Sequence, residues 1–103
     1  HLPNWQASVR LLSDLPAVET SPGEPVVQSF VEAATQVMGK PPAPETVRFA
    51  TEAAIFVTAL HVPCIIFGPG NAALAHQPDE FTEIDELVQA AHVYAAAAVK
   101  LLA

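Results

Sequence analysis

The chain has 103 residues, of which 51% are hydrophobic, and its formal net charge is −7 at pH 7. A chain of this length supports one small domain that buries about 60–70% of its unfolded surface. Its only basic side chains are Arg10, Lys40, Arg48 and Lys100, and this composition argues against binding to nucleic-acid phosphates or to acidic membrane surfaces.

The first half of the chain predicts a strand followed by a helix. Residues 6–12 contain alternating apolar side chains and predict a short strand. Residues 21–24 (SPGE) have the form of a capping box with proline at the first helical position. Apolar residues then recur at helical spacing as far as Met38, and Gly39 provides a stop signal. The proline-rich connector 40–44 cannot continue a helix.

The second half continues this alternation of strands and helices. Residues 46–50 predict a strand, after which Thr51 is the expected N-cap of a short helix that runs to Leu60. Residues 62–67 form a continuous apolar run rich in β-branched side chains, as in a strand buried on both faces. Thr82 is expected to start the last helix, which has an apolar face. The pattern predicts an α/β fold, with helices packed on a partial sheet.

Residues 67–80 (FGPGNAALAHQPDE) are the most informative stretch. The apolar run ends in a Gly-Pro-Gly turn, and a loop of small residues then delivers His76 beside Asp79 and Glu80. At the end of a buried strand, such a loop offers backbone N–H groups to an anion and an imidazole to a metal. From spacing alone, a loop histidine without a ligand role is the commoner outcome, so both interpretations stay open.

This stretch resembles the closing segment of the zinc-dependent aminoacylase family, which includes acetylornithine deacetylase, succinyl-diaminopimelate desuccinylase and related carboxypeptidases and dipeptidases. The matching motifs are Thr-Glu-Ala at 51–53, Pro63, Gly-Pro-Gly at 68–70 and Ala-His-Gln-Pro-Asp-Glu at 75–80. Their order and spacing agree with the acetylornithine deacetylase branch. The resemblance extends from about Leu12 to the end of the chain.

The resemblance implies that the chain is part of a longer enzyme. Residues 1–17 would be the last strand of an inserted lid, or dimerisation, domain, and residues 18–103 would be the C-terminal part of the catalytic domain. Family members carry most metal ligands and the general base in an N-terminal half, and no segment here resembles those motifs. The fragment is therefore expected to be inactive alone and to hold no catalytic residue. Its expected partners are the remainder of its own catalytic domain and, in a homodimer, a second copy.

The resemblance identifies His76 with the family's final metal ligand. Zinc is the expected metal, with cobalt or manganese as alternatives. Glu52 and Glu80 are expected at the pocket rim or behind the metal ligand, although helix-dipole complementarity would explain Glu52 and turn capping would explain Glu80. His61 at a helix end and His92 within the last helix are expected to have structural roles only.

Gly68, Gly70 and Asn71 are the expected substrate-binding residues. By resemblance, the backbone N–H groups of this loop would donate to a substrate carboxylate, and the side chain of Asn71 would add a donor. For the two glycines, a turn that requires positive φ is the structural alternative, and the two roles are compatible.

The whole enzyme is expected to be a dimetal amidohydrolase in which a metal-activated water attacks the amide carbonyl of an N-acyl amino acid. N-acetylornithine is the first choice of substrate. Desuccinylase or dipeptidase activity is the alternative within the class, and a non-catalytic domain that packs against a partner is the alternative outside it. Because no signal peptide or apolar stretch of membrane-spanning length is seen, a cytoplasmic location is expected. Cys64, the single cysteine, lies in an apolar run and is expected to be buried, with no disulfide.

Overall fold

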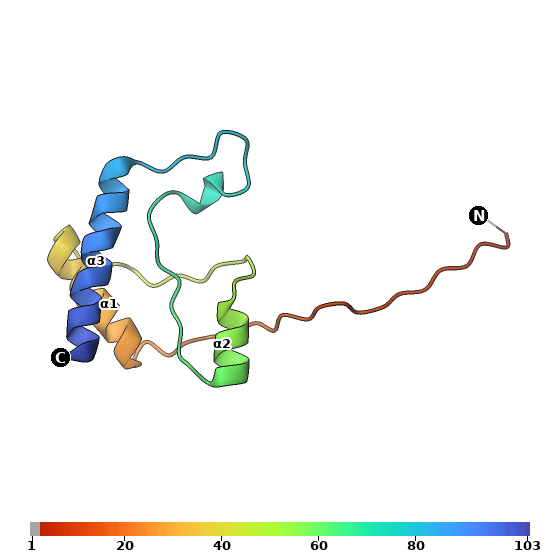
Figure 1. Ribbon diagram of the computed structural model, residues 1–103, viewed down its shortest axis with the longest axis horizontal. Helices are drawn as coiled ribbons and strands as arrows, with labels where there is room; N and C mark the ends of the chain where they lie inside the picture. The colour runs from red at the N-terminus through yellow and green to blue at the C-terminus, as the bar shows by residue number, and fades with distance from the viewer. Residues whose placement is uncertain (1–2) are drawn as a thin grey trace.

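The computed structural model describes residues 3–103, which form three α-helices and one short 3-10 helix (Figure 1). The elements in chain order are α1 (Pro25–Met38), α2 (Ala53–Leu60), η1 (Ala72–Leu74) and α3 (Ile84–Leu102). An extended N-terminal segment leaves the helical body, which explains principal extents of 65 × 36 × 19 Å. None of the described helices has the length and apolar character needed to cross a membrane.

The predicted α/β sheet is wrong, because no residue between 3 and 103 is in a strand. Residues 6–12, 46–50 and 62–67 all lie outside regular secondary structure. Their β-branched and alternating side chains favour extended backbone. A strand, however, also needs a neighbouring strand to pair its N–H and C=O groups. Within the described residues, none of the three segments forms such a ladder with another.

The core lies where α1 and α3 pack against each other (Figure 1). The residues buried at this contact are Ala33, Ala34, Val93 and Ala97. Three of the four are alanines, and such small side chains let two helices approach closely. Val93 is the largest side chain that is fully buried. The core is therefore thin, and partly buried apolar side chains pack around it, namely Phe30, Val37, Phe67 and Ala96.

The two ends of α1 show one prediction confirmed and one wrong. Gly39 adopts the left-handed conformation at φ 81° as the C-cap, as its position predicted. The predicted capping box does not form: the helix begins at Pro25, whose fixed φ and missing N–H suit the first helical position. The hydroxyl of Ser21 instead accepts a hydrogen bond from the N–H of Gly23 at 3.3 Å, closing a turn ahead of the helix.

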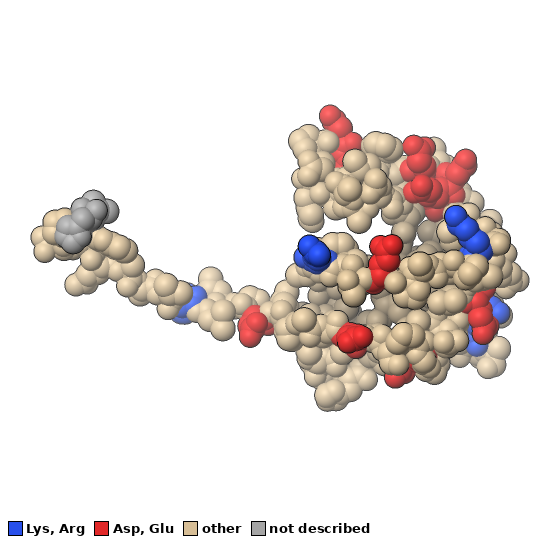
Figure 2. Space-filling model, turned by 180° about the vertical axis from the view of Figure 1, so that it is seen from behind, with Lys and Arg blue, Asp and Glu red and all other residues tan. Residues whose placement is uncertain are grey.

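The starts of α2 and α3 lie close to their predicted positions. The N-cap of α2 is Glu52, without a side-chain capping bond, so the predicted N-cap Thr51 lies one residue too early. Thr51 Oγ1 accepts a hydrogen bond from the N–H of Ala53 at 3.2 Å, at the start of the helix. α3 begins two residues after Thr82, with Asp85 and Glu86 in its first turn. Acidic side chains gather at this end of the molecule (Figure 2), where they complement the positive end of the helix dipole.

An aromatic cluster holds Phe67, which precedes the glycine loop (residues 68–71), against the two core helices. Phe30 of α1, Phe67 and Tyr94 of α3 surround one another, with ring centroids separated by 5.4 or 5.5 Å. The pair of Phe67 and Tyr94 is T-shaped, an arrangement that aromatic rings favour. The hydroxyl of Tyr94 also donates to the carbonyl oxygen of Phe67. These contacts place the loop that follows Phe67 relative to α1 and α3.

The side-chain hydroxyl of Thr20, which precedes α1, is hydrogen-bonded to the middle of the extended segment 62–67. Thr20 Oγ1 donates to the carbonyl oxygen of Cys64 at 2.5 Å and lies 3.2 Å from the N–H of the same residue, which donates to it. The side chain thus satisfies both backbone groups of Cys64, as a neighbouring strand would. Cys64 is half-buried and forms no disulfide.

Replacing Thr20 with valine is expected to lower the free energy of unfolding by about 1–2 kcal/mol, because both backbone groups of Cys64 lose their partner. Thr35→Val is the matched control, since the hydroxyl of Thr35 donates only to Val31 of its own helix. Urea denaturation measures the free energy, and amide hydrogen exchange at Cys64 reports the local effect. Unchanged exchange at Cys64 in Thr20→Val would show that this contact does not hold the two segments together.

Candidate functional site

In the Gly-Pro-Gly loop, the backbone conformation and the neighbouring atoms require glycine at position 70 but not at position 68. Gly70 has φ 93°, and its N–H donates to Glu86 Oε2 at 2.9 Å. A Cβ atom added to Gly70 would lie 2.9 Å from Thr82 Oγ1, whereas one added to Gly68 would meet open space. The predicted turn with positive φ is therefore present at Gly70. Sequence analysis missed Glu86, because an acid in the first turn of a helix already has a structural explanation.

Asn71 shapes the loop that follows. Its side-chain Oδ1 accepts a hydrogen bond from the N–H of Ala73 at 2.9 Å and caps the short helix η1. The side-chain oxygen is therefore used within the loop. The donor role expected for Asn71 in substrate binding would fall to its side-chain nitrogen, and this role stays a prediction.

His76 sits in a tight turn with its side chain exposed. Its backbone is left-handed, with φ 60°, and Asp79 has the same value. The N–H of His76 donates to Glu80 Oε2 at 3.2 Å, which closes the turn. Within residues 3–103, neither ring nitrogen of His76 has a hydrogen-bond partner, so the imidazole is accessible to a ligand.

The metal expected at His76 would need further ligands. An imidazole nitrogen is a good ligand for zinc, but protein zinc sites take three or four side-chain ligands. No group of three or more His, Cys, Asp or Glu side chains that could hold a metal ion is found among residues 3–103. The nearby carboxylate of Glu80 is engaged by the backbone of His76. The donor chemistry of His76 therefore fits one ligand position, and the described residues do not form a complete metal site.

A small pocket lies between the glycine loop and the start of α3. It has a volume of about 140 Å³ and is lined by Gly70, Asn71, Leu74, Phe81, Thr82, Glu83 and Glu86. Of the residues predicted to bind the substrate, the pocket includes Gly70 and Asn71, which are neighbours in the sequence. The lining does not include Gly68, His76, Glu52 or Glu80. Glu52 lies instead at the exposed start of α2.

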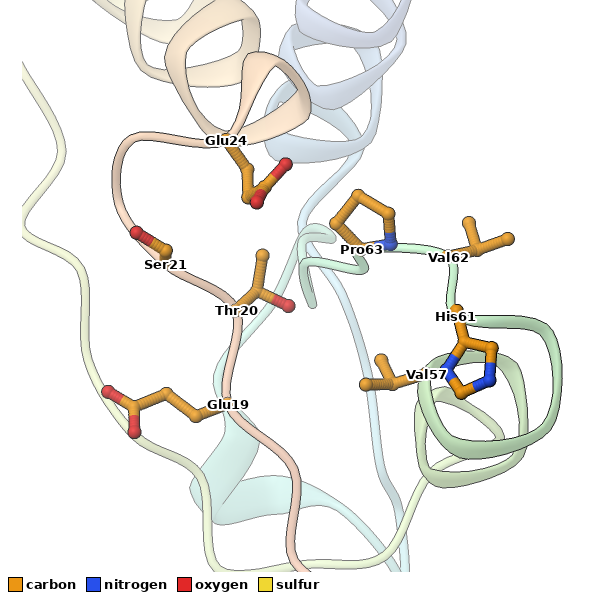
Figure 3. A pocket seen from close by; sticks show the side chains of 8 residues that line it. All are labelled: Glu19, Thr20, Ser21, Glu24, Val57, His61, Val62 and Pro63. Carbon is orange, nitrogen blue, oxygen red and sulfur yellow. The ribbon is translucent and has the colours of Figure 1, made fainter.

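A larger, open pocket was not anticipated from the sequence (Figure 3). It has a volume of about 260 Å³ and is lined by Glu19, Thr20, Ser21, Glu24, Val57, His61, Val62 and Pro63. Glu24 points into the space beside Pro63, whereas Glu19 points away from it (Figure 3). No local pattern could have predicted this pocket, because its walls come from two segments, residues 19–24 and 57–63, that are far apart in the sequence. His61 is the left-handed C-cap of α2, at the helix end where a structural role was expected.

Comparison with known proteins gives one family and several relatives. Residues 6–100 match the family described as peptidase family M20/M25/M40. The chain is 35% identical over 95 residues to an acetylornithine deacetylase of Myxococcus xanthus, covering 92% of this chain and 23% of that protein. It is 40% identical over 67 residues to an acetylornithine deacetylase of Aliivibrio salmonicida, covering 65% of this chain and 16% of the relative.

A third relative carries a different name. The N-formyl-4-amino-5-aminomethyl-2-methylpyrimidine deformylase of Bacillus subtilis is 31% identical over 74 residues, covering 72% of this chain and 17% of that protein. The chain therefore spans less than a quarter of the length of each of these relatives. No solved structure matches this chain significantly. The family resemblance identified from the sequence motifs is confirmed.

Proposed function

Because the chain belongs to peptidase family M20/M25/M40, we propose that it is the C-terminal part of a metal-dependent amidohydrolase of the acetylornithine deacetylase type. The proposed reaction removes the acyl group from an N-acyl amino acid, with N-acetylornithine as the first candidate. The 35% identity to the Myxococcus protein over 92% of this chain carries the proposal. That alignment covers 23% of the relative, so the general base and most metal ligands are proposed to come from the rest of the protein.

His76 is proposed to hold one of the metal ions of the complete site. When bound, a divalent metal such as zinc would supply Lewis-acid activation of water and of the amide carbonyl. The contribution of this chain is to present an exposed imidazole on a closed turn, and the accessibility of both ring nitrogens supports that role. Cobalt and manganese stay alternative metals.

The glycine loop is proposed to bind the carboxylate of the substrate. The N–H of Gly70 already binds a carboxylate oxygen, that of Glu86, at 2.9 Å. This contact supports the proposal, because a substrate carboxylate would make the same bond to the same donor. Glu86 would then have to turn away from Gly70 when the substrate binds. The side-chain nitrogen of Asn71, which lines the same pocket, is the proposed second donor.

The exposed apolar side chains of α2 support the proposal that another part of the protein covers this helix. Ala54 is the one buried residue of this helix, whereas Ile55, Phe56 and Leu60 are 52%, 44% and 60% exposed. Contiguous exposed apolar surface commonly marks an interaction site. We propose that the remainder of the same catalytic domain covers this face, and that the complete protein is a homodimer. The cytoplasmic location expected from the sequence stays a prediction.

The 103-residue chain alone is expected to show no deacetylase activity, because it offers one metal ligand where a site needs several together with a base. A longer protein that contains this chain and the N-terminal half typical of the family is expected to release acetate from N-acetylornithine in the presence of zinc. Acetate release from equal concentrations of the two proteins tests this. Zinc-dependent turnover by the short chain would refute the division of the site between the two parts.

Deformylation is a second candidate reaction, supported by the 31% identity to the Bacillus deformylase. Desuccinylase and dipeptidase activities are two further candidates within the same class of enzyme. A substrate panel of N-acetyl, N-formyl and N-succinyl amino acids and a dipeptide, tested on the longer protein, separates them by kcat/KM. Absence of turnover on the whole panel would favour a non-catalytic packing domain.

A further inference from the structure

We propose that Glu80 is a positioning residue for His76, acting through the backbone N–H of His76 and not through its imidazole. The proposal rests on the proposed role of His76 as a metal ligand. Its basis is the 3.2 Å hydrogen bond between the N–H of His76 and Glu80 Oε2, formed while His76 is in the left-handed region.

The left-handed backbone of His76 needs support. This conformation costs a residue with a Cβ atom about 1–2 kcal/mol, which is why single non-glycine residues adopt it mainly where other contacts compensate. On the N-terminal side, the N–H of Gln77 donates to the carbonyl oxygen of Leu74 at 3.2 Å and closes one turn. On the C-terminal side, the carboxylate of Glu80 binds the N–H of His76. The two bonds clamp His76 from both directions.

The local sequence explains how Glu80 reaches back to His76. Pro78 has a fixed φ and stiffens the turn. Asp79, at φ 60°, reverses the chain, so that the side chain of Glu80 returns toward the residue four positions earlier. A carboxylate that accepts from a backbone N–H makes a charge-assisted bond, which is stronger than its neutral counterpart. The ring of His76 takes no part in this bond and remains accessible for coordination.

His76 and Glu80 are both exposed. Loss of their hydrogen bond is therefore expected to change the direction in which the imidazole points and to leave the global stability unchanged. Groups that orient a metal ligand without touching the metal typically change metal affinity by about 10–100-fold when they are removed. Glu80 would act in this way, by fixing the backbone from which the imidazole projects.

The first test is nuclear magnetic resonance of the 103-residue chain with three variants. Glu80→Ala removes the acceptor, Glu80→Gln keeps an acceptor oxygen of similar reach, and Asp85→Ala is a matched control for the loss of a nearby exposed acid. Glu80→Ala is expected to shift the His76 amide resonance and to weaken the strong intraresidue HN–Hα contact that marks positive φ. Glu80→Gln and Asp85→Ala are expected to keep both signals. Unchanged His76 signals in Glu80→Ala, or equal changes in Asp85→Ala, would overturn the proposal.

The second test is the zinc affinity of a longer protein that carries the same variants. Glu80→Ala is expected to lower the affinity about 10-fold or more, with recovery in Glu80→Gln and an unchanged unfolding midpoint. Equal zinc affinity in Glu80→Ala and the unchanged protein would overturn the positioning role. If His76→Ala left the zinc content of that protein unchanged, the proposed function would fail, while the resonance experiment would still decide whether Glu80 sets the backbone of His76.

Discussion

In a longer protein that carries this chain, His76→Ala is expected to lower zinc content and to reduce kcat/KM by roughly 100-fold or more. Removing a group that only orients a ligand already costs about 10–100-fold, and removing the ligand itself should cost at least as much. The exposed imidazole of His76, without a protein partner within residues 3–103, is available for this role. Zinc content and steady-state kinetics with N-acetylornithine are the measurements.

His61→Ala and His92→Ala are the matched controls, since both side chains are exposed and neither is in the Gly70–Glu80 loop. Both variants are expected to keep kcat/KM within a few-fold and to keep their zinc. His61→Ala is expected to lower the unfolding midpoint slightly, because His61 is the left-handed C-cap of α2. If all three variants lost activity and metal alike, the assignment of His76 as the ligand would be wrong.

Gly70→Val is expected to lower the free energy of unfolding by about 2 kcal/mol, with little change for Gly68→Val. Two effects add at Gly70. A β-branched residue resists its φ of 93°, and the new Cβ atom would lie 2.9 Å from Thr82 Oγ1. Neither effect applies to Gly68, where a Cβ atom meets open space. Chemical denaturation of the 103-residue chain measures both variants.

A double substitution separates the two effects at Gly70. In a Thr82→Ala background the close contact is relieved, so Gly70→Ala should cost only the strain of positive φ, about 1 kcal/mol. In the longer protein, a higher KM for Gly70→Val at unchanged metal content of the folded enzyme would support the binding of the substrate carboxylate by this loop. Normal substrate binding by the folded Gly70→Val enzyme, beside its lower stability, would leave Gly70 as a turn residue only.

Local signals predicted where the helices lie, although the capping box at 21–24 did not form. The stop at Gly39 and the bond of Thr51 at the start of α2 depend on residues within one turn of the helix end, so the sequence contains the necessary information. The predicted strands failed because a ladder depends on a second segment, and β propensity says nothing about whether that segment is present. In this structure the partner of Cys64 is a threonine hydroxyl from 44 positions earlier, which no local pattern reveals.

In the candidate site, too, local contacts could be predicted from the sequence, whereas contacts between distant residues could not. The proximity of Glu80 to His76 was open to prediction, since a short loop with proline keeps residues four apart within reach. The contact between Gly70 and Glu86 spans 16 positions and depends on how α3 packs. For the same reason, the sequence could not predict that the Thr82 side chain leaves no room for a Cβ atom at position 70. Motif resemblance identified Gly70 as a substrate-binding residue, which stays a prediction, and the structure adds a steric reason for glycine at this position.

The separation of α1 and α3 along the chain has a consequence for how the chain folds. The buried core is made by these two helices, so residues 39–83 must be closed into a loop before any of it forms. Closing a flexible loop of that length costs on the order of 3 kcal/mol in entropy. A single helix of 14 residues such as α1 is marginal in water by itself. During synthesis, α1 is therefore expected to pack only after α3 has left the ribosome, and the hydrogen bond between Gly70 and Glu86 of α3 is expected to form in that late step.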